Sequence, residues 1–138
     1  MKNTLIETLL ITGSRKIAPK LTRMAKEAVW RAKMNHWYVI CGDAEGVDET
    51  VIVECDKHEV PITVFGAFGI VRHSTVTGRN VPLGVPYLTR DRRMAVLCTK
   101  CLSLHNTQSE THGTQYTYDQ VKALGKECWL REDDGSGT

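Results

Sequence analysis

Strand-like runs alternate with helix-like segments along this chain, and the alternation limits the fold more than any other feature. Five runs rich in β-branched and other apolar residues lie at residues 5–12, 37–41, 61–65, 101–105 and 127–130. Segments with helical periodicity separate most of them, and the clearest is residues 19–35. Strands joined through helices form a parallel sheet with right-handed crossovers. We therefore expect an α/β fold of three layers, with helices on both faces of a mainly parallel five-stranded sheet.

The length of the chain fits a single domain. A chain of 138 residues builds one hydrophobic core and has no room for a second. We expect the domain to span residues 1–130 and the acidic, glycine-rich residues 131–138 to form a disordered tail. No apolar run approaches the ~18 residues of a membrane span, and the beginning of the sequence lacks a secretory pattern. These observations predict no membrane contact and a cytoplasmic location.

Three glycine-bearing turns follow predicted strands and precede predicted helices. They are Gly13-Ser14 with Arg15 beside them, the stretch from Gly42 to Asp48, and Gly113-Thr114. In a parallel sheet such turns meet at the carboxyl edge, where backbone N–H groups and helix N-termini bind phosphate. Glycine is also needed for the backbone angles of turns, Asp48 can be an ordinary helix N-cap, and Arg15 can be a solvated loop residue. Both interpretations stay open for each turn, and together the turns favour a nucleotide site.

Charge is distributed unevenly although the net charge is only +2. Residues 43–59 hold seven acidic residues against one lysine, whereas residues 66–93 hold five arginines against one aspartate. Residues 66–86 contain four glycines and two prolines without a clear period, and such a long connection is typical of a binding loop. We expect this loop to cover the ligand, with a mere insertion as the alternative. Arg79 in the loop and Arg90 at the start of the next helix are candidates to bind an anion.

The five cysteines do not predict a disulfide framework or a metal site. Cys98 and Cys101 form a C-x-x-C pair, but the sequence supplies neither a second such pair nor a histidine pair. We expect buried thiols. Neither a metal nor a resident cofactor is predicted.

Four motifs in order resemble the SLOG superfamily. They are Thr12-Gly13-Ser14-Arg15, Gly42-x-Ala44-x-Gly46-x-Asp48, Arg90-x-x-x-Met94 and Gly113-Thr114. This group includes the "lonely guy" phosphoribohydrolases and the lysine decarboxylase-like proteins, and the chain is most similar to its small single-domain branch in bacteria and phages. The resemblance implies a Rossmann-like sheet that binds nucleotide-derived ligands, and it implies a homodimer or larger homo-oligomer. Trp30, Trp37 and Tyr38 are candidates for such an interface or for the core.

The enzymatic branch of that superfamily implies Arg90 as a functional residue and a glutamate three residues after the Gly-Thr pair. This chain has Thr117 at that position. Glu110 and Asp119 are the replacement carboxylates nearby, and Asp119 lies on a different side of the helix from residue 117. Asp43 stands where the family often has a second glycine.

We favour binding or sensing of a nucleotide-derived anion, such as ADP-ribose, an NAD derivative or a nucleoside monophosphate. The predicted ligand-binding residues are Gly13, Ser14, Arg15, Gly42, Asp43, Ala44, Gly46, Asp48, Arg79, Arg90, Gly113 and Thr114, with Asp48 accepting from a ribose hydroxyl. The alternative is an N-glycosidase, a phosphoribohydrolase or deoxyribosyltransferase in which Arg90 acts with Glu110 or Asp119. DNA binding is the weakest hypothesis, since the arginines do not form a phosphate-tracking stripe.

Overall fold

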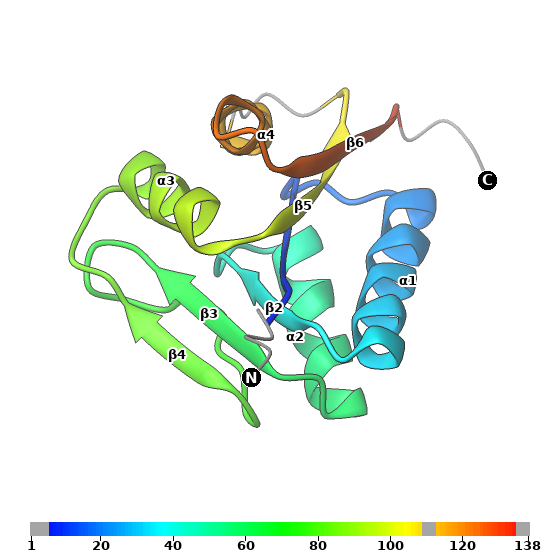
Figure 1. Cartoon of the computed structure of the whole chain (residues 1–138), viewed down its shortest axis with the longest axis horizontal. Coiled ribbons are helices and arrows are strands. Elements are labelled where there is room, and N and C mark those ends of the chain that lie inside the picture. The colour runs from blue at the N-terminus through cyan, green and yellow to red at the C-terminus, as the bar shows by residue number, and fades with distance from the viewer. Residues whose placement is uncertain (1–5, 109–112, 135–138) are drawn as a thin grey trace, which may run out of the picture.

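The computed structural model describes residues 6–108 and 113–134, and within them the chain forms one parallel sheet of six strands flanked by helices. The strand order is β4-β3-β2-β1-β5-β6, and every neighbouring pair is parallel. Helices α1 and α2 cover one face of the sheet, and α3 and α4 cover the other (Figure 1). In chain order the elements are β1 (Thr8–Gly13), α1 (Pro19–Asn35), β2 (Tyr38–Cys41), α2 (Val47–His58), β3 (Ile62–Gly66), β4 (Arg79–Pro82), α3 (Tyr87–Leu97), β5 (Lys100–Asn106), α4 (Gly113–Ala123) and β6 (Glu127–Asp133).

The central strand β1 explains why the fold has three layers. Its residues Leu9, Leu10 and Ile11 are all buried, although successive side chains of a strand point to opposite faces. Leu9 and Ile11 pack in the core beneath α1 and α2, and Leu10 packs in the core beneath α3 and α4. A strand that is apolar at consecutive positions therefore needs a helical layer on each side.

Helix α1 forms as its apolar repeat predicts. Pro19 occupies the first turn, where the missing N–H costs nothing, and Leu21, Ala25 and Val29 are fully buried along one side. His36 ends the helix in the left-handed conformation, at φ 57°, and its N–H bonds to the last carbonyls. The predicted α/β fold and the boundaries of this helix are confirmed.

The prediction of five strands was wrong, because the sheet contains a sixth. Strand β4 lies inside the segment that was expected to lack regular structure, and it pairs with β3 from Thr63↔Arg79 to Gly66↔Pro82. Asp56 of α2 fixes the turn before β4, since its carboxylate accepts hydrogen bonds from the backbone N–H groups of Val76 and Thr77. The segment is therefore held against the domain by α2 and β3.

The last strand also runs further than predicted. β6 continues to Asp133 and pairs with β5 up to Asn106↔Asp133. Residues 131–133 thus belong to the sheet and not to the predicted disordered tail, while residues 135–138 lie outside the described part of the chain.

The cysteines agree with the expectation of buried thiols. Cys41, Cys55, Cys98 and Cys101 are buried and Cys128 is half-buried, and all five are free thiols. Among the described residues, no group of three potential ligands is arranged to hold a metal ion. No helix in that same part of the chain is both long and apolar enough to cross a bilayer.

Candidate functional site

A pocket of about 210 Å³ lies at the carboxyl edge of the sheet, where the strand-to-helix turns meet. The end of β1, the turn after β2, the beginning of α3 and the beginning of α4 form its walls. Its lining includes Thr12, Gly13, Arg15, Gly42, Ala44, Asp48, Arg72, Tyr87, Arg90, Asp91, Gly113 and Thr114. Segments about 100 positions apart in the chain therefore share one cavity, as the ends of adjacent parallel strands do.

Two glycines allow the close approach of these segments. A Cβ atom on Gly13 would lie 2.4 Å from Cγ2 of Val47 and 2.7 Å from the carbonyl oxygen of Leu104. A Cβ atom on Gly42 would lie 2.9 Å from Oδ2 of Asp48 and 3.0 Å from Nη1 of Arg90. Gly13 thus lets α2 pack onto β1, and Gly42 lets the Arg90 guanidinium lie against the turn.

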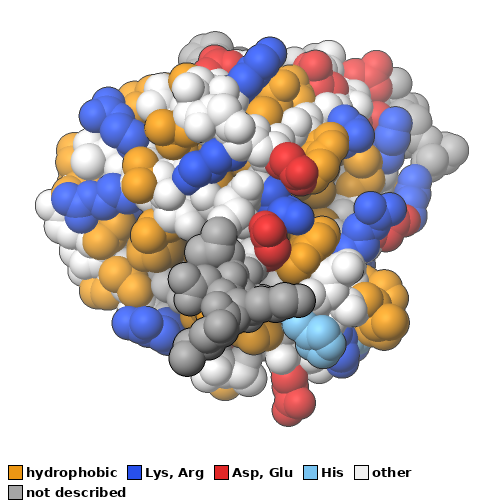
Figure 2. Space-filling model, in the orientation of Figure 1, with side chains coloured by type: hydrophobic (Ala, Val, Ile, Leu, Met, Phe, Trp, Pro, Cys, Tyr) orange, Lys and Arg blue, Asp and Glu red, His pale blue; other side chains and the backbone are white. Residues whose placement is uncertain are grey.

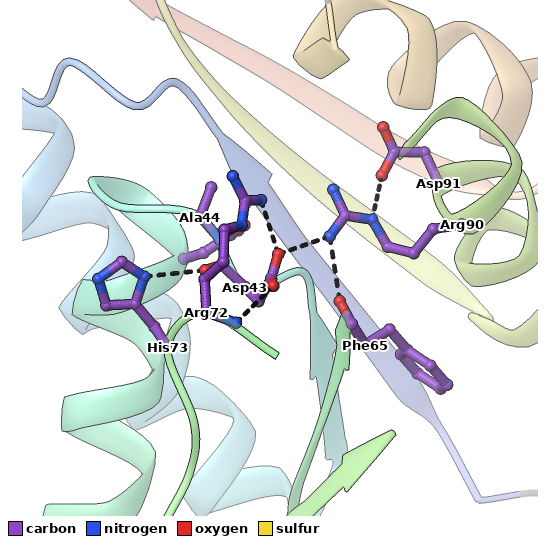
Figure 3. Close-up of polar contacts among 8 residues, drawn as sticks. Asp43, Ala44, Phe65, Arg72, His73, Arg90 and Asp91 are labelled. Carbon is purple, nitrogen blue, oxygen red and sulfur yellow. Dashed lines mark hydrogen bonds and ion pairs between the residues drawn. The ribbon is translucent and has the colours of Figure 1, made fainter. Parts of the chain in front are cut away.

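Asp43 binds two arginines beneath the pocket, and Figure 3 shows its carboxylate between their guanidinium groups. Oδ1 accepts from Nη2 of Arg72 at 2.7 Å and from Nη1 of Arg90 at 2.9 Å, and Oδ2 accepts from the Arg72 backbone N–H at 2.7 Å. Burial opposes the ionisation of Asp43, but the Arg72 hydrogen bonds and the charges of both arginines outweigh it and lower its pKa. Asp43 is therefore an ionised positioning residue with no exposed surface.

Arg90 is held on three sides. Besides Asp43, its Nη1 donates to the carbonyl of Phe65 at 3.0 Å, and its Nε donates to Oδ1 of Asp91 at 2.8 Å. Tyr87, one turn earlier on α3, lies under the guanidinium groups of both Arg72 and Arg90, at 4.7 and 5.4 Å from its ring centre. Arg72 and Arg90 are thus fixed in place before any ligand arrives, which lowers the entropy cost of binding.

Asp48 is the unusual group of the site. Its Oδ2 accepts a hydrogen bond from the N–H of Ala44 at 3.1 Å, whereas its Oδ1 is buried and has no partner among the described residues. Burial raises the pKa of Asp48 to about 7, and the nearby Asp91 and Asp43 add to this, while Arg90 and the Ala44 N–H oppose it. Buried polar atoms are nearly always hydrogen-bonded, so an unpaired one on a residue that lines a pocket is a candidate ligand contact.

Most of the residues predicted from sequence line this pocket. Those that do are Gly13, Arg15, Gly42, Ala44, Asp48, Arg90, Gly113 and Thr114.

Four predicted residues do not line it. Ser14 is buried, and its hydroxyl accepts from the Asn106 N–H at 2.9 Å, which ties β1 to β5. Gly46 packs against the carbonyls of Ser14 and Arg15, and Asp43 lies behind the arginines. Arg79 is exposed at the amino end of β4, away from the carboxyl edge, because the expected loop is a strand there.

The predicted catalytic residues are not all assembled. Arg90 lines the pocket, but Asp119 is exposed on α4 and accepts from Nε2 of Gln115 at 2.9 Å. Thr117 is fully buried and its hydroxyl donates to the Gly113 carbonyl at 2.9 Å. Glu110 lies outside the described residues. The carboxylates that line the cavity are Asp48 and Asp91, and sequence reasoning had no role for Asp91.

Sequence reasoning also missed the roles of Arg72 and Tyr87. Arg72 belongs to the arginine-rich segment, and its neighbour His73 has its Nδ1 2.9 Å from the Asp43 carbonyl oxygen. We expected this segment to cover the site, which includes Arg72. The contact of Arg72 with Asp43, 29 positions earlier in the chain, is visible only in the folded structure. Tyr87 gave no signal beyond its place at a helix start.

The visible surface carries both signs of charge. In Figure 2 lysine, arginine, aspartate and glutamate side chains are interspersed with apolar ones on the face shown, without one continuous basic stripe. A duplex-tracking surface needs such a stripe.

Several solved structures superpose on this chain. Neither a family model nor a curated protein matches the sequence. A molybdenum cofactor binding protein from Rippkaea orientalis superposes with a TM-score of 0.81 at 13% identity, covering 96% of this chain and 80% of that one. The protein TM1055 superposes with a TM-score of 0.75 at 16% identity, covering 89% of this chain and 72% of that one. The DNA processing protein DprA from Streptococcus pneumoniae superposes with a TM-score of 0.72 at 12% identity, covering 91% of this chain and 50% of that one. The chain shares the Rossmann-like α/β fold of these structures, as its order of strands and helices predicted.

Proposed function

We propose that this SLOG-type chain binds a nucleotide-derived anion, such as ADP-ribose, an NAD derivative or a nucleoside monophosphate, in the pocket at the carboxyl edge of its sheet. One observation carries the proposal. Three turns from distant parts of the sequence line a single cavity together with Arg15, whose guanidinium makes no ion pair with any described residue. Arg72 and Arg90 both form ion pairs with Asp43, so Arg15 is the arginine whose charge is left for an incoming anion.

The phosphate subsite lies toward Gly13, Arg15 and the beginning of α4. Gly113 and Thr114 open that helix, whose first N–H groups have no intrahelical partners and whose dipole favours an anion. In the turn after β2, by contrast, the Ala44 N–H bonds to Asp48 and the Val47 N–H bonds to the Ser14 carbonyl. That turn therefore has fewer donors to offer than its sequence indicated.

Two solved structures with this fold are of proteins named for binding or carrying a small molecule. Two of the superposable structures, from R. orientalis and Chlamydomonas reinhardtii, are molybdenum cofactor binding or carrier proteins, the second at a TM-score of 0.66 and 14% identity over 91% of this chain and 76% of that one. At such identities the likeness supports a small-molecule site on this fold and leaves the ligand to experiment.

The test is thermal unfolding of the protein with NAD, ADP-ribose, AMP, cyclic nucleotides and nucleoside monophosphates, followed by chromatography of each mixture. A ligand at a hundred times its dissociation constant adds about 2.7 kcal/mol to the free energy of unfolding. Stabilisation with the ligand recovered intact supports the proposal. Absence of a shift with every nucleotide contradicts it.

N-glycosidase activity is the second candidate, because two carboxylates line the cavity. Asp48 and Asp91 replace Glu110 and Asp119 as groups that can assist water at a glycosidic carbon. Release of free base in the same chromatograms, abolished by Asp91→Asn, supports this activity. Binding without release leaves the protein a sensor or carrier. A homo-oligomer and a cytoplasmic location remain predictions from the sequence.

A further inference from the structure

The charges around the pocket balance when every group is ionised. Arg15, Arg72 and Arg90 line it together with Asp48 and Asp91, and Asp43 lies behind the arginines, so the formal charges of these six groups sum to zero. Desolvating an anion in a neutral, partly enclosed site is costly. Neutralising one of the carboxyl groups would strengthen the attraction that Arg15 and the beginning of α4 exert on an anion.

Asp48 is the carboxyl group that protonates at least cost. Asp43 is tied to two guanidinium groups and Asp91 to one, and protonation of either would weaken an ion pair of 2.7 to 2.9 Å. Asp48 makes no ion pair, and its Oδ1 has no partner among the described residues. Its pKa of about 7, raised by burial, means that the neutral form is already well populated near neutral pH.

The geometry also fixes where the proton sits. The Ala44 N–H donates to Oδ2, so this oxygen must remain an acceptor. A proton on Asp48 therefore belongs on Oδ1, where it makes the carboxyl group a hydrogen-bond donor. An oxygen atom of a phosphate or a carbonyl group is the matching acceptor on a ligand.

We propose that the pocket binds its anionic ligand together with a proton, which Asp48 holds on Oδ1 and donates to a ligand oxygen atom. This inference rests on the proposed function, and it adds a pH-linked control of affinity and a specific contact. It also reverses the expectation that Asp48 accepts from a ribose hydroxyl, because a hydroxyl donor would favour the ionised carboxylate.

The charged groups around Asp48 have to be considered as other sources of a pH-dependent affinity. Those that face it or the pocket are Cys41 of β2, Asp43 of the following turn, Arg72 and His73 of the segment after β3, Arg90 and Asp91 of α3, and Arg15. Burial raises the pKa of Cys41 well above its usual range, and the arginines stay charged. His73 is the histidine of this set, and its Nδ1 lies 2.9 Å from the Asp43 carbonyl oxygen, so it needs its own control.

Asp48→Asn separates the two roles of this side chain. The Ala44 N–H requires an acceptor, so the amide oxygen takes the place of Oδ2 and the amide NH₂ takes the place of Oδ1. The variant thus presents a permanent donor with no charge, which imitates the protonated acid. If Asp48 instead serves as an acceptor, the same variant replaces an acceptor by a donor and must weaken binding.

The experiment is calorimetry with ADP-ribose from pH 6 to 8.5, on the wild type, Asp48→Asn and His73→Gln. ADP-ribose is a suitable probe because its diphosphate lacks the phosphate-monoester ionisation near pH 6. For the wild type we expect affinity to fall about tenfold per pH unit above pH 7, with nearly one proton taken up per ligand in buffers of different ionisation enthalpy. His73→Gln should keep this slope. Asp48→Asn should bind with nearly the same affinity throughout, close to the wild-type value at pH 6.

Each other result overturns the inference in a recognisable way. A wild-type affinity that is constant or rises with pH, together with weak binding by Asp48→Asn, makes Asp48 an acceptor of a ligand hydroxyl. A slope that persists in Asp48→Asn and disappears in His73→Gln assigns the proton to His73. Failure of the wild type to bind ADP-ribose or any of the other nucleotides at pH 6 overturns the proposed function itself.

Discussion

The carboxylate of Asp43 and the guanidinium of Arg90 are 47 positions apart in the chain and lie 2.9 Å apart in the fold, where they join the turn after β2 to the beginning of α3. Arg72, from a third segment, donates a hydrogen bond to the same carboxylate.

We expect Asp43→Ala to destabilise the protein by about 3–5 kcal/mol, because it leaves buried Arg90 without this partner. Urea denaturation measures the effect. The matched control is Asp119→Ala, whose exposed side chain should matter by less than about 0.5 kcal/mol, and equal losses in the two variants would refute the role of Asp43.

Arg15 should contribute to binding without contributing to folding. Arg15 lines the pocket, and its guanidinium makes no ion pair with a described carboxylate. Arg15→Ala should weaken the binding of ADP-ribose by about 1.5–3 kcal/mol, the free energy of a charge-assisted hydrogen bond. It should leave the unfolding temperature unchanged. Arg79→Ala removes an equal charge from the far end of β4 and should bind as the wild type does. A similar loss of affinity in both variants would indicate general attraction and not a contact.

The stability of the free protein should fall as pH rises from about 4 to 7 through the titration of Asp48. Its pKa is raised from 3.8 in the unfolded chain to about 7, so the folded state holds a proton that the unfolded state has lost. The destabilisation is absent below the lower value and complete above the higher one, at roughly 3–5 kcal/mol. Asp43 and Asp56 act in the opposite direction, since their pKa values are lowered. The difference between wild type and Asp48→Asn, followed by denaturation at several pH values, isolates the effect; a constant difference across this range would contradict it.

Two glycines should respond in opposite ways to the same substitution. Gly46 has φ +84°, and an added Cβ atom would lie 2.3 Å from the Arg15 carbonyl oxygen. Gly46→Ala should therefore cost about 2–4 kcal/mol through backbone strain and crowding. Nothing lies within 4 Å of a Cβ atom at Gly84, so Gly84→Ala should be neutral or stabilising by up to about 1 kcal/mol. Calorimetric unfolding of the two variants distinguishes these outcomes.

The sequence was informative where one segment decides its own structure. The consecutive apolar residues of β1 and the regular repeat of α1 predicted their elements, and the three turns predicted the edge at which a pocket forms. Strand β4 was missed because its four residues end in Pro82, are mostly exposed, and become a strand only by pairing with β3. Arg79 was misplaced for the same reason.

The chemistry of the pocket depends on contacts that no local pattern contains. The sequence predicted Asp43 as a ligand contact, but its carboxylate forms ion pairs with Arg72 and Arg90. Asp91 was hidden in a run of arginines, yet its side chain orients Arg90. Oδ1 of Asp48 is unpaired only in the folded state, because no described hydrogen-bond donor lies close enough to it.

The most direct test of the account is to map amide chemical shifts in the protein during titration with ADP-ribose. A second cavity, of about 230 Å³, lies on the α1 side of the sheet among Met24, Trp37 and Trp129, and it serves as the internal comparison. We predict saturable shifts at Gly13, Arg15, Ala44, Gly113 and Thr114, with little change at Met24, Trp37 and Trp129. Shifts concentrated around the second cavity, or none that saturate, would contradict a nucleotide site at the carboxyl edge.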